Sequence, residues 1–274
     1  MYVFYLIRVI IFLALSKFNL FYNMKRLYGI VLLFLFFQNI TFAQDLPSIQ
    51  TDRPDQTECP FITPRHYFQF ENGFSYEQNN QNSNSFVAPT VLTRFGINDH
   101  FELRLITEYA INKNELEKTK GINPVLIGFK TRLFEEKGLI PTTSFIGHIG
   151  IPNLASKDLK TIYYAPEFRF TMQHTISEKQ SLSYNIGSEW NGETAEPMLI
   201  YTLTSGYSFT EKIGGYLELY GFVPQIEKPD HRFDAGLTYL CNPNHQLDIS
   251  GGFGLSKNSP NYYLSLGYSF RFKI

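Results

Sequence analysis

The chain has 274 residues, with 24 Lys or Arg against 25 Asp or Glu and a formal net charge of −1. This balance argues against a general nucleic-acid binder, which needs a basic excess, and a hydrophobic content of 43% argues against disorder. Two cysteines are too few for a disulfide scaffold or a cysteine-rich zinc module. The 26 Phe and 18 Tyr residues favour half-buried pleated surfaces, so we expect many β-strands.

The first 43 residues have the features of a targeting region. Residues 24–43 begin with a Lys-Arg pair, continue as an apolar run and end at Ala43, which predicts a secretory signal peptide cleaved after that residue. We expect translation to start at Met24 and residues 1–23 to be an upstream extension; the alternative is a two-helix membrane anchor. No later apolar run reaches the roughly 18 to 20 residues of a spanning helix, so the mature chain cannot cross a membrane as helices.

Residues 44–65, called the leader below, precede the first regular pattern. Within it, Thr51–Glu58 reads TDRPDQTE and carries four charges in eight positions. This segment cannot be an alternating strand, because Pro54 lacks a backbone donor and the charges crowd both faces. Asp52 and Asp55 by themselves are a weak signal for a divalent cation, which needs more oxygen ligands, so no metal site is predicted.

From His66 onward, apolar and polar residues alternate with period 2, which is the pattern of a sheet with two different faces. In the first such segment the aromatic residues at positions 68, 70, 74 and 76 share one face, opposite Gln, Glu and Ser residues. We expect twelve strands, near residues 66–78, 86–97, 101–111, 121–134, 140–151, 162–175, 181–190, 197–209, 213–223, 231–241, 246–256 and 262–272.

The charged residues inside these twelve segments all fall on the polar face. Nine are acidic and seven are basic: Glu71, Glu77, Arg94, Glu102, Arg104, Glu108, Lys130, Arg132, Glu167, Arg169, Glu189, Glu218, Arg232, Asp234, Asp248 and Arg271. A soluble sandwich turns such a face to water, whereas a transmembrane barrel turns it to an enclosed interior. Periodicity alone does not separate these two classes.

The connections favour the barrel. Short turns, such as residues 98–100 and 242–245, alternate along the chain with generally longer loops, such as 112–120 and 152–161. Outer-membrane barrels have this asymmetry and an even number of strands, and closure removes exposed strand edges. We therefore predict an all-β fold, an antiparallel up-and-down transmembrane β-barrel of about 12 strands over residues 66–274. It would lie in the cell outer membrane, with the leader on the periplasmic side.

In such a barrel the leader has two interpretations. As a periplasmic plug or latch, it would bring Asp52, Arg53, Asp55 and Glu58 to the barrel mouth, where they pair with lumen charges. The candidate partners are Arg94, Arg104, Lys130, Arg132 and Arg271. As a flexible segment, the leader would keep its charges in solvent.

The sixteen charged residues of the polar face are predicted to line the lumen. Mixed signs on neighbouring strands would form paired ladders that narrow the pore and favour polar or zwitterionic solutes over bulk ions. The alternative is that the pairs fill a closed interior without transport, because a barrel of this size lies between small filled barrels and wide porins.

Two segments resemble a known family. They are TDRPDQTECPFITP at residues 51–64, followed by YFQFENGFSYE, and DAGLTYLCNPNHQLDISGGFGLSKNSPNYYLSLGYSFRF at residues 234–272. They are similar to the start and the last three strands of the meta-pathway phenol-degradation family, also called outer-membrane transporters. Cys59 stands where we expect Ser, and Lys273 and Ile274 follow the terminal Phe. The resemblance implies a Gram-negative, porin-like channel or transporter for small organic solutes, aromatic ones included, and we expect it to be passive or gated.

A barrel-borne lipid hydrolase is the rival class. His148 with Ser144, or His174 with Ser177, could be proposed as a nucleophile and its base. Neither pair comes with an oriented acid or a nucleophile-elbow motif, so we expect a non-enzyme without catalytic residues or cofactors.

The remaining expectations concern cross-links and partners. Cys59 and Cys241 both lie toward the periplasmic side in this topology, so a disulfide between them is left open. The predicted partners are membrane lipid and lipopolysaccharide, a small-molecule solute and the outer-membrane assembly machinery, with no nucleic acid.

Overall fold

The computed structural model describes residues 46–79 and 83–274, and Pro47–Ile274 form one compact unit. The predicted signal peptide and upstream extension fall outside the described residues. Within the described part, no helix combines the length and the hydrophobicity needed to span a membrane.

Regular structure in this part consists of thirteen strands and two short 3-10 helices. Their bounds are β1 (Tyr67–Gln78), β2 (Asn84–Asn98), β3 (Phe101–Lys113), β4 (Lys118–Ile122), β5 (Val125–Phe134), β6 (Thr142–Ile151), η1 (Pro152–Leu154), η2 (Lys157–Leu159), β7 (Ala165–Thr175), β8 (Gln180–Glu189), β9 (Met198–Ser208), β10 (Ile213–Pro224), β11 (Asp230–Asn242), β12 (His245–Gly254) and β13 (Tyr262–Lys273).

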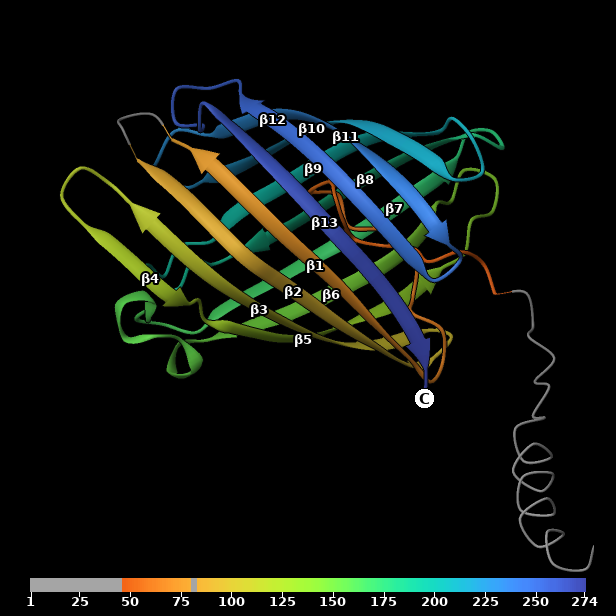
Figure 1. Ribbon diagram of the computed structural model, residues 1–274, viewed down its shortest axis with the longest axis horizontal. Coiled ribbons are helices and arrows are strands. Elements are labelled where there is room, and N and C mark those ends of the chain that lie inside the picture. Colours follow the sequence, from red (N-terminus) through yellow and green to blue (C-terminus); the bar gives the residue numbers. More distant parts are fainter. Residues whose placement is uncertain (1–45, 80–82) are drawn as a thin grey trace, which may run out of the picture. The chain divides into compact units, whose positions relative to one another are not determined.

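The strands form a closed antiparallel ring (Figure 1). β1 pairs with both β2 and β13, which closes the sheet, and β3 pairs with both β2 and β5. β4 pairs only with the end of β3 and extends that hairpin beyond the ring, so the ring itself has twelve strands. The predicted fold class is therefore confirmed. The single strand expected over residues 121–134 is divided between β4 and β5, because Pro124 lacks the N–H that a continuous ladder needs.

Outward and inward faces have opposite chemistry. On β10, Leu217 and Leu219 are 58% and 46% exposed, whereas Glu218 between them is 1% exposed. A two-layer sandwich would bury the leucines and expose the carboxylate, so this arrangement fits a wall with lipid outside and an enclosed polar interior. The fully buried side chains include Arg94 and Lys130, and such charges are tolerated only when they are paired.

The two ends of the barrel differ in their connections. Residues 99–100 join β2 to β3 and residues 243–244 join β11 to β12, at the end where the N–H of Ile274 bonds to the carbonyl of His66. At the other end, residues 152–164 join β6 to β7. Because outer-membrane barrels have short periplasmic turns and longer outer loops, the first end is called periplasmic below and the second extracellular.

Candidate functional site

The leader runs inside the barrel without forming a helix or a strand between residues 46 and 64 (Figure 1). Both of its ends are fixed near the periplasmic end. The N–H of Ile49 donates to the carbonyl of Pro243 at 2.8 Å, and the N–H of His66 donates to the carbonyl of Gly96 at 2.9 Å. A Cβ on Gly96 would lie 2.3 Å from the Thr63 carbonyl oxygen, so only glycine allows the leader backbone to approach β2 this closely.

Asp52 is the centre of a buried charge cluster. Its carboxylate accepts hydrogen bonds from Lys130 Nζ at 2.8 and 2.9 Å and from a guanidinium nitrogen of Arg104 at 2.6 Å, and Arg94 lies 3.5 Å away. Burial by itself would raise the pKa of Asp52, but the charges of Arg94, Lys130 and Arg104 outweigh it and hold the pKa well below the usual value. Asp52 is therefore ionised, and its carboxylate anchors the leader to the wall of the barrel.

Asp52 and Cys59 close a loop in the leader. The Cys59 N–H donates to Asp52 Oδ1 at 2.9 Å, and Lys130 Nζ donates to the Cys59 carbonyl at 2.8 Å. The six residues between them, Arg53–Glu58, are called the tip loop below. Burial, reinforced by the charge of Asp52, raises the pKa of the Cys59 thiol to about 12. Cys59 and Cys241 are both free, so the disulfide left open by the sequence is not formed.

Hydroxyl groups and a glutamate hold one side of the tip loop against β9 and β10. Thr57 Oγ1 lies 2.6 Å from Thr202 Oγ1, 2.7 Å from Thr204 Oγ1 and 2.5 Å from a carboxylate oxygen of Glu218. The N–H of Gln56 donates to the other oxygen of Glu218 at 2.8 Å. Glu218 therefore accepts hydrogen bonds from two successive residues of the tip loop.

Ion pairs hold the remaining parts of the tip loop. Arg53 pairs with Asp248 at 2.8 Å and donates to Ser265 at 2.9 Å, which ties one end of the loop to β12 and β13. Glu58 pairs with Arg104 at 3.0 Å at the other end. Together with the bonds to β9 and β10, these ion pairs attach the tip loop to β3, β12 and β13, so the loop contacts several separate parts of the ring.

Asp55 differs from the other charged residues of the leader. None of the ion pairs found among residues 46–79 and 83–274 involves its carboxyl group, and the charges that act on its pKa are those of other acids. Burial raises the pKa of Asp55 well above the usual value, and the negative charges of Glu218, Asp234 and Asp52 raise it further. The structure therefore favours a protonated Asp55.

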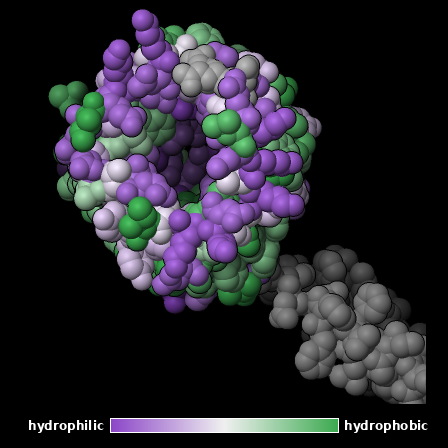
Figure 2. Space-filling view, turned by 90° about the vertical axis from the view of Figure 1, so that its left-hand side faces the viewer, coloured by the Kyte–Doolittle hydropathy of each residue, from purple (hydrophilic) through white to green (hydrophobic). Residues whose placement is uncertain are grey.

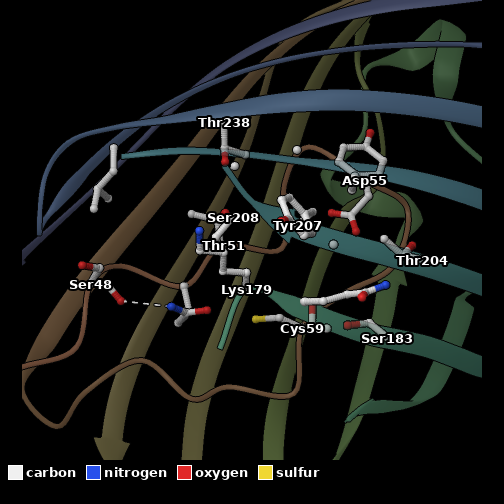
Figure 3. Close-up of a pocket in the computed structure, with 18 of the residues that line it drawn as sticks. Ser48, Thr51, Asp55, Cys59, Lys179, Ser183, Thr204, Tyr207, Ser208 and Thr238 are labelled. Carbon is white, nitrogen blue, oxygen red and sulfur yellow. Dashed lines mark hydrogen bonds between the residues drawn. The ribbon is translucent and has the colours of Figure 1, made fainter. Parts of the chain in front are cut away.

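A polar cavity of about 470 Å³ separates part of the leader from β7–β12 and the periplasmic turns. Figure 3 shows Ser48, Thr51 and Asp55 of the leader around the same space as Thr204 and Thr238 of the strands. Viewed from the extracellular end, Figure 2 shows a hollow rimmed by hydrophilic residues that leads into the barrel. The interior therefore contains polar space in addition to the leader.

The charges predicted as partners of the leader divide into two groups. Arg94, Arg104 and Lys130 contact Asp52 as described. Arg132 instead pairs with Glu135 at 3.4 Å. Arg271 donates to backbone carbonyls, including that of Pro47 in the leader, and not to a leader carboxylate.

The other predicted lumen residues bond mainly within the wall. Glu102 pairs with Arg94 at 2.8 Å, Glu167 contacts His148, Arg169 pairs with Glu189 at 3.1 Å, Arg232 pairs with Glu77 at 2.7 Å, Glu108 accepts from Thr90 at 3.0 Å, and Asp234 accepts from Tyr216 and Tyr263. Sequence reasoning missed the neutral groups that hold the tip loop, among them Thr57, Thr202 and Asn185. The inward position of Thr202 and Asn185 was visible in the alternation, but an uncharged side chain there carries no specific signal, and Thr57 lies in the leader, where no alternation exists.

The two Ser/His pairs considered for hydrolysis are not assembled. His148 uses one ring nitrogen with Glu167 at 2.5 Å and the other with Arg104 at 3.0 Å. Ser144 donates to the carbonyl of Pro60 at 2.6 Å. His174 lies near Tyr184 and Glu136. No group of His, Cys, Asp and Glu side chains within the described residues is arranged to hold a metal ion.

Comparison with known proteins finds a family whose model matches this chain and solved structures with a similar fold. A family model described as "Putative MetA-pathway of phenol degradation" matches residues 51–272. The structure is similar to the COG4313 outer membrane channel from Pseudomonas putida F1, with 14% identity, a TM-score of 0.60, and coverage of 81% of this chain and 100% of that chain.

Two porins have a similar fold. The NanC porin gives 8% identity and a TM-score of 0.51, covering 74% of this chain and 98% of that chain. The KdgM porin solved with disordered oligogalacturonate gives 10% identity and a TM-score of 0.50, covering 75% and 99%. No match is found among the curated proteins. At these identities the likeness concerns the fold.

Proposed function

The chain belongs to the family described as "Putative MetA-pathway of phenol degradation", and we propose that it is an outer-membrane channel for small organic solutes, gated by its leader. The observation that carries this proposal is the way the leader occupies the interior. Its tip loop is held by hydrogen bonds and ion pairs to polar side chains and borders a polar cavity. Water or a solute can replace such bonds, whereas a tightly packed apolar plug could not be released without exposing apolar surface.

The proposed gate has a fixed part and a movable part. Asp52, buried among three basic side chains, holds the ends of the tip loop against the wall, because its departure would leave the buried Lys130 without an ion-pair partner among the described residues. The tip loop is held by Glu218, by neutral hydroxyl groups and by the ion pairs of Arg53 and Glu58, whose side chains are partly exposed, and these bonds exchange more easily with water. Movement of the tip loop alone would connect the periplasmic cavity with the extracellular hollow.

The residues that line the periplasmic cavity indicate which class of solute would bind there. Serine, threonine and glutamine side chains surround the periplasmic cavity, together with the inward-facing Tyr216. Hydroxyl and amide groups suit small polar organic molecules, and Tyr216, with the family's description, extends the proposal to aromatic acids and phenols. The signal peptide, the plug role of the leader and assistance from the outer-membrane assembly machinery are proposed with it.

Liposome swelling tests the function directly. Vesicles containing the full chain should swell in small sugars, amino acids and aromatic acids, and swelling should increase after deletion of residues 44–64. If neither protein admits any solute, the barrel is a structural element and the channel proposal fails.

A cross-link should close the gate. The two hydroxyl oxygens of Thr57 and Thr202 are 2.6 Å apart, so cysteines at both positions are close enough for a disulfide. In a chain whose own cysteines are replaced by serine, we expect the oxidised Thr57→Cys, Thr202→Cys variant to conduct less than its reduced form. Single-channel recording before and after reduction measures this change.

The matched control for the cross-link carries Thr57→Cys alone in the same serine background. Its conductance should not respond to oxidation, because the partner thiol is missing. Equal conductance of the oxidised and reduced double variant would show that solutes pass without movement of the tip loop.

Conductance should rise with pH because of Asp55. Its pKa is raised in the closed state and would return to the ordinary value when the loop is hydrated, so the closed state binds the proton more tightly. The resulting stabilisation is complete below the ordinary pKa of an aspartate and is lost as pH rises through the raised pKa. Asp52 has the opposite shift, so its contribution is lost only in strong acid.

Planar-bilayer recordings over a pH series measure this dependence. The variant Asp55→Asn has the same shape without the titrating proton, so its open probability should be nearly independent of pH between mildly acidic and alkaline conditions. A pH response of the same size in this variant would assign the effect to another group.

A further inference from the structure

The β3–β4 hairpin lies at the extracellular end of the barrel (Figure 1). Three lysines form a cluster on its outer face. The register pairs Lys113 directly with Lys118, and Lys120 with Ile111. Because alternate residues of paired strands share a face, Lys113, Lys118 and Lys120 lie on the same outward face as Tyr109. All three lysines are exposed. They are called the lysine cluster below.

The lysine cluster is an exception on the outer wall. Apart from these three lysines, all Asp, Glu, Lys and Arg residues of strands β1–β13 lie on the inward face according to the alternation. No ion pair within the described residues involves the ammonium group of Lys113, Lys118 or Lys120. The cluster is therefore a concentration of positive charge on a wall that is otherwise uncharged.

Within the cluster the register opposes two lysines, while the acids of the hairpin, Glu115 and Glu117, lie in the connecting loop. Like charges directly opposite each other destabilise an antiparallel pair, as Lys113 and Lys118 do here. The hairpin is held in place by a second loop, because the Ile122 N–H donates to Ser156 Oγ at 2.8 Å and the Ser156 N–H donates to the Ile122 carbonyl at 2.9 Å. The loop thus supports the Ile122 end of β4, and the register of the hairpin sets Lys113 opposite Lys118.

The surroundings of the cluster identify its partner. Tyr109 and Ile122 are paired neighbours on the same face, 39% and 44% exposed, and they continue the lipid-facing surface up to the lysines. A molecule that covers both surfaces must combine acyl chains with an anionic headgroup at the extracellular level. We propose that the lysine cluster binds the phosphate groups of lipopolysaccharide in the outer leaflet, with acyl chains against Tyr109 and Ile122. Lysine ammonium groups suit phosphate as point charges.

Native mass spectrometry of the detergent-solubilised full chain tests this site. The probes are purified rough lipopolysaccharide, the same material after enzymatic dephosphorylation, and phosphatidylglycerol. We expect the variant Lys113→Gln, Lys118→Gln, Lys120→Gln to bind the phosphorylated lipopolysaccharide at least about tenfold more weakly than the wild type. Dephosphorylated material should bind both proteins equally weakly.

The control variant changes three exposed lysines on the periplasmic turns, Lys137→Gln, Lys179→Gln and Lys212→Gln, and alters the net charge by the same amount. It should bind lipopolysaccharide like the wild type. Equal loss in both variants, or phosphatidylglycerol binding with the same dependence on the lysine cluster, would overturn the proposal in favour of general attraction to anionic lipid.

A charge reversal provides a second, independent test. Lys118→Glu converts the repulsive pair with Lys113 into an attractive one, so the hairpin should be at least as stable as in the wild type without lipid. The variant should nevertheless bind lipopolysaccharide more weakly. Undiminished binding by a folded Lys118→Glu protein would contradict the assignment, and thermal unfolding with and without lipopolysaccharide measures both effects.

Discussion

Replacing Asp52 with alanine is expected to lower the free energy of unfolding of the barrel by about 3–5 kcal/mol, the usual cost of removing one partner from a buried ion pair. This cost arises because Lys130 loses its ion-pair partner. Among the described residues its Nζ forms an ion pair with Asp52 alone, whereas Arg104 keeps Glu58 and Glu102. The substitution leaves Lys130 fully buried, with the carbonyl of Cys59 as the remaining hydrogen-bond partner of its Nζ among the described residues. Urea unfolding in lipid vesicles measures the loss.

A double substitution separates this mechanism from a general loss of packing. Adding Lys130→Met to Asp52→Ala removes the unpaired charge and should recover most of the lost stability, because the two effects are coupled. The control Asp158→Ala removes an exposed aspartate from η2 and should change stability by less than about 0.5 kcal/mol. If Lys130→Met in the double variant adds to the damage, Asp52 acts through some contact other than Lys130.

Replacing the tip loop, Arg53–Glu58, with an equally long Gly-Ser sequence should produce the largest change in conductance. The replacement keeps Asp52 and Cys59 but removes the bonds of Arg53 to Asp248 and of Thr57 to Glu218. Hydrogen bonds to charged groups contribute roughly 1.5–3 kcal/mol each, so losing two shifts the closed-to-open ratio by about a hundredfold or more. We therefore expect a channel that is open most of the time in planar bilayers.

The control for the tip loop places Gly-Ser in the extracellular loop at residues 225–228, whose side chains are not part of the interior bonds described above. Its conductance should match that of the wild type. A tip-loop variant that folds and stays closed would mean that another part of the leader, or the wall itself, blocks the passage.

The alternation of residues predicted much of the fold in detail. Its period indicated twelve strands and assigned each side chain to one of two faces, because successive side chains of a strand must point in opposite directions. β4 was missed, since Lys118–Ile122 is short and lies in a stretch of charged residues that reads as a loop. The hairpin forms because the end of β3, which includes Lys113, extends past the ring and pairs with β4.

The candidate site was predicted only in part. The charges of Asp52 and of Arg94, Arg104 and Lys130 pointed to pairing, because buried charges require partners. The choice of partners could not be predicted, because several arginines on the inward face had the same chemistry and only the path of the leader distinguishes them. Arg132 and Arg271 have the right charge and lie beside other groups.

By itself, the sequence determined the strands, their two faces and the presence of a charged, proline-containing leader, because these follow from local period, charge and backbone chemistry. The tertiary structure decided which face is enclosed, since that depends on β1 meeting β13 across nearly the whole length of the chain. It also decided that Thr57 meets Glu218 and that Lys113 faces Lys118. Contacts of this kind depend on register and closure, which no single segment encodes.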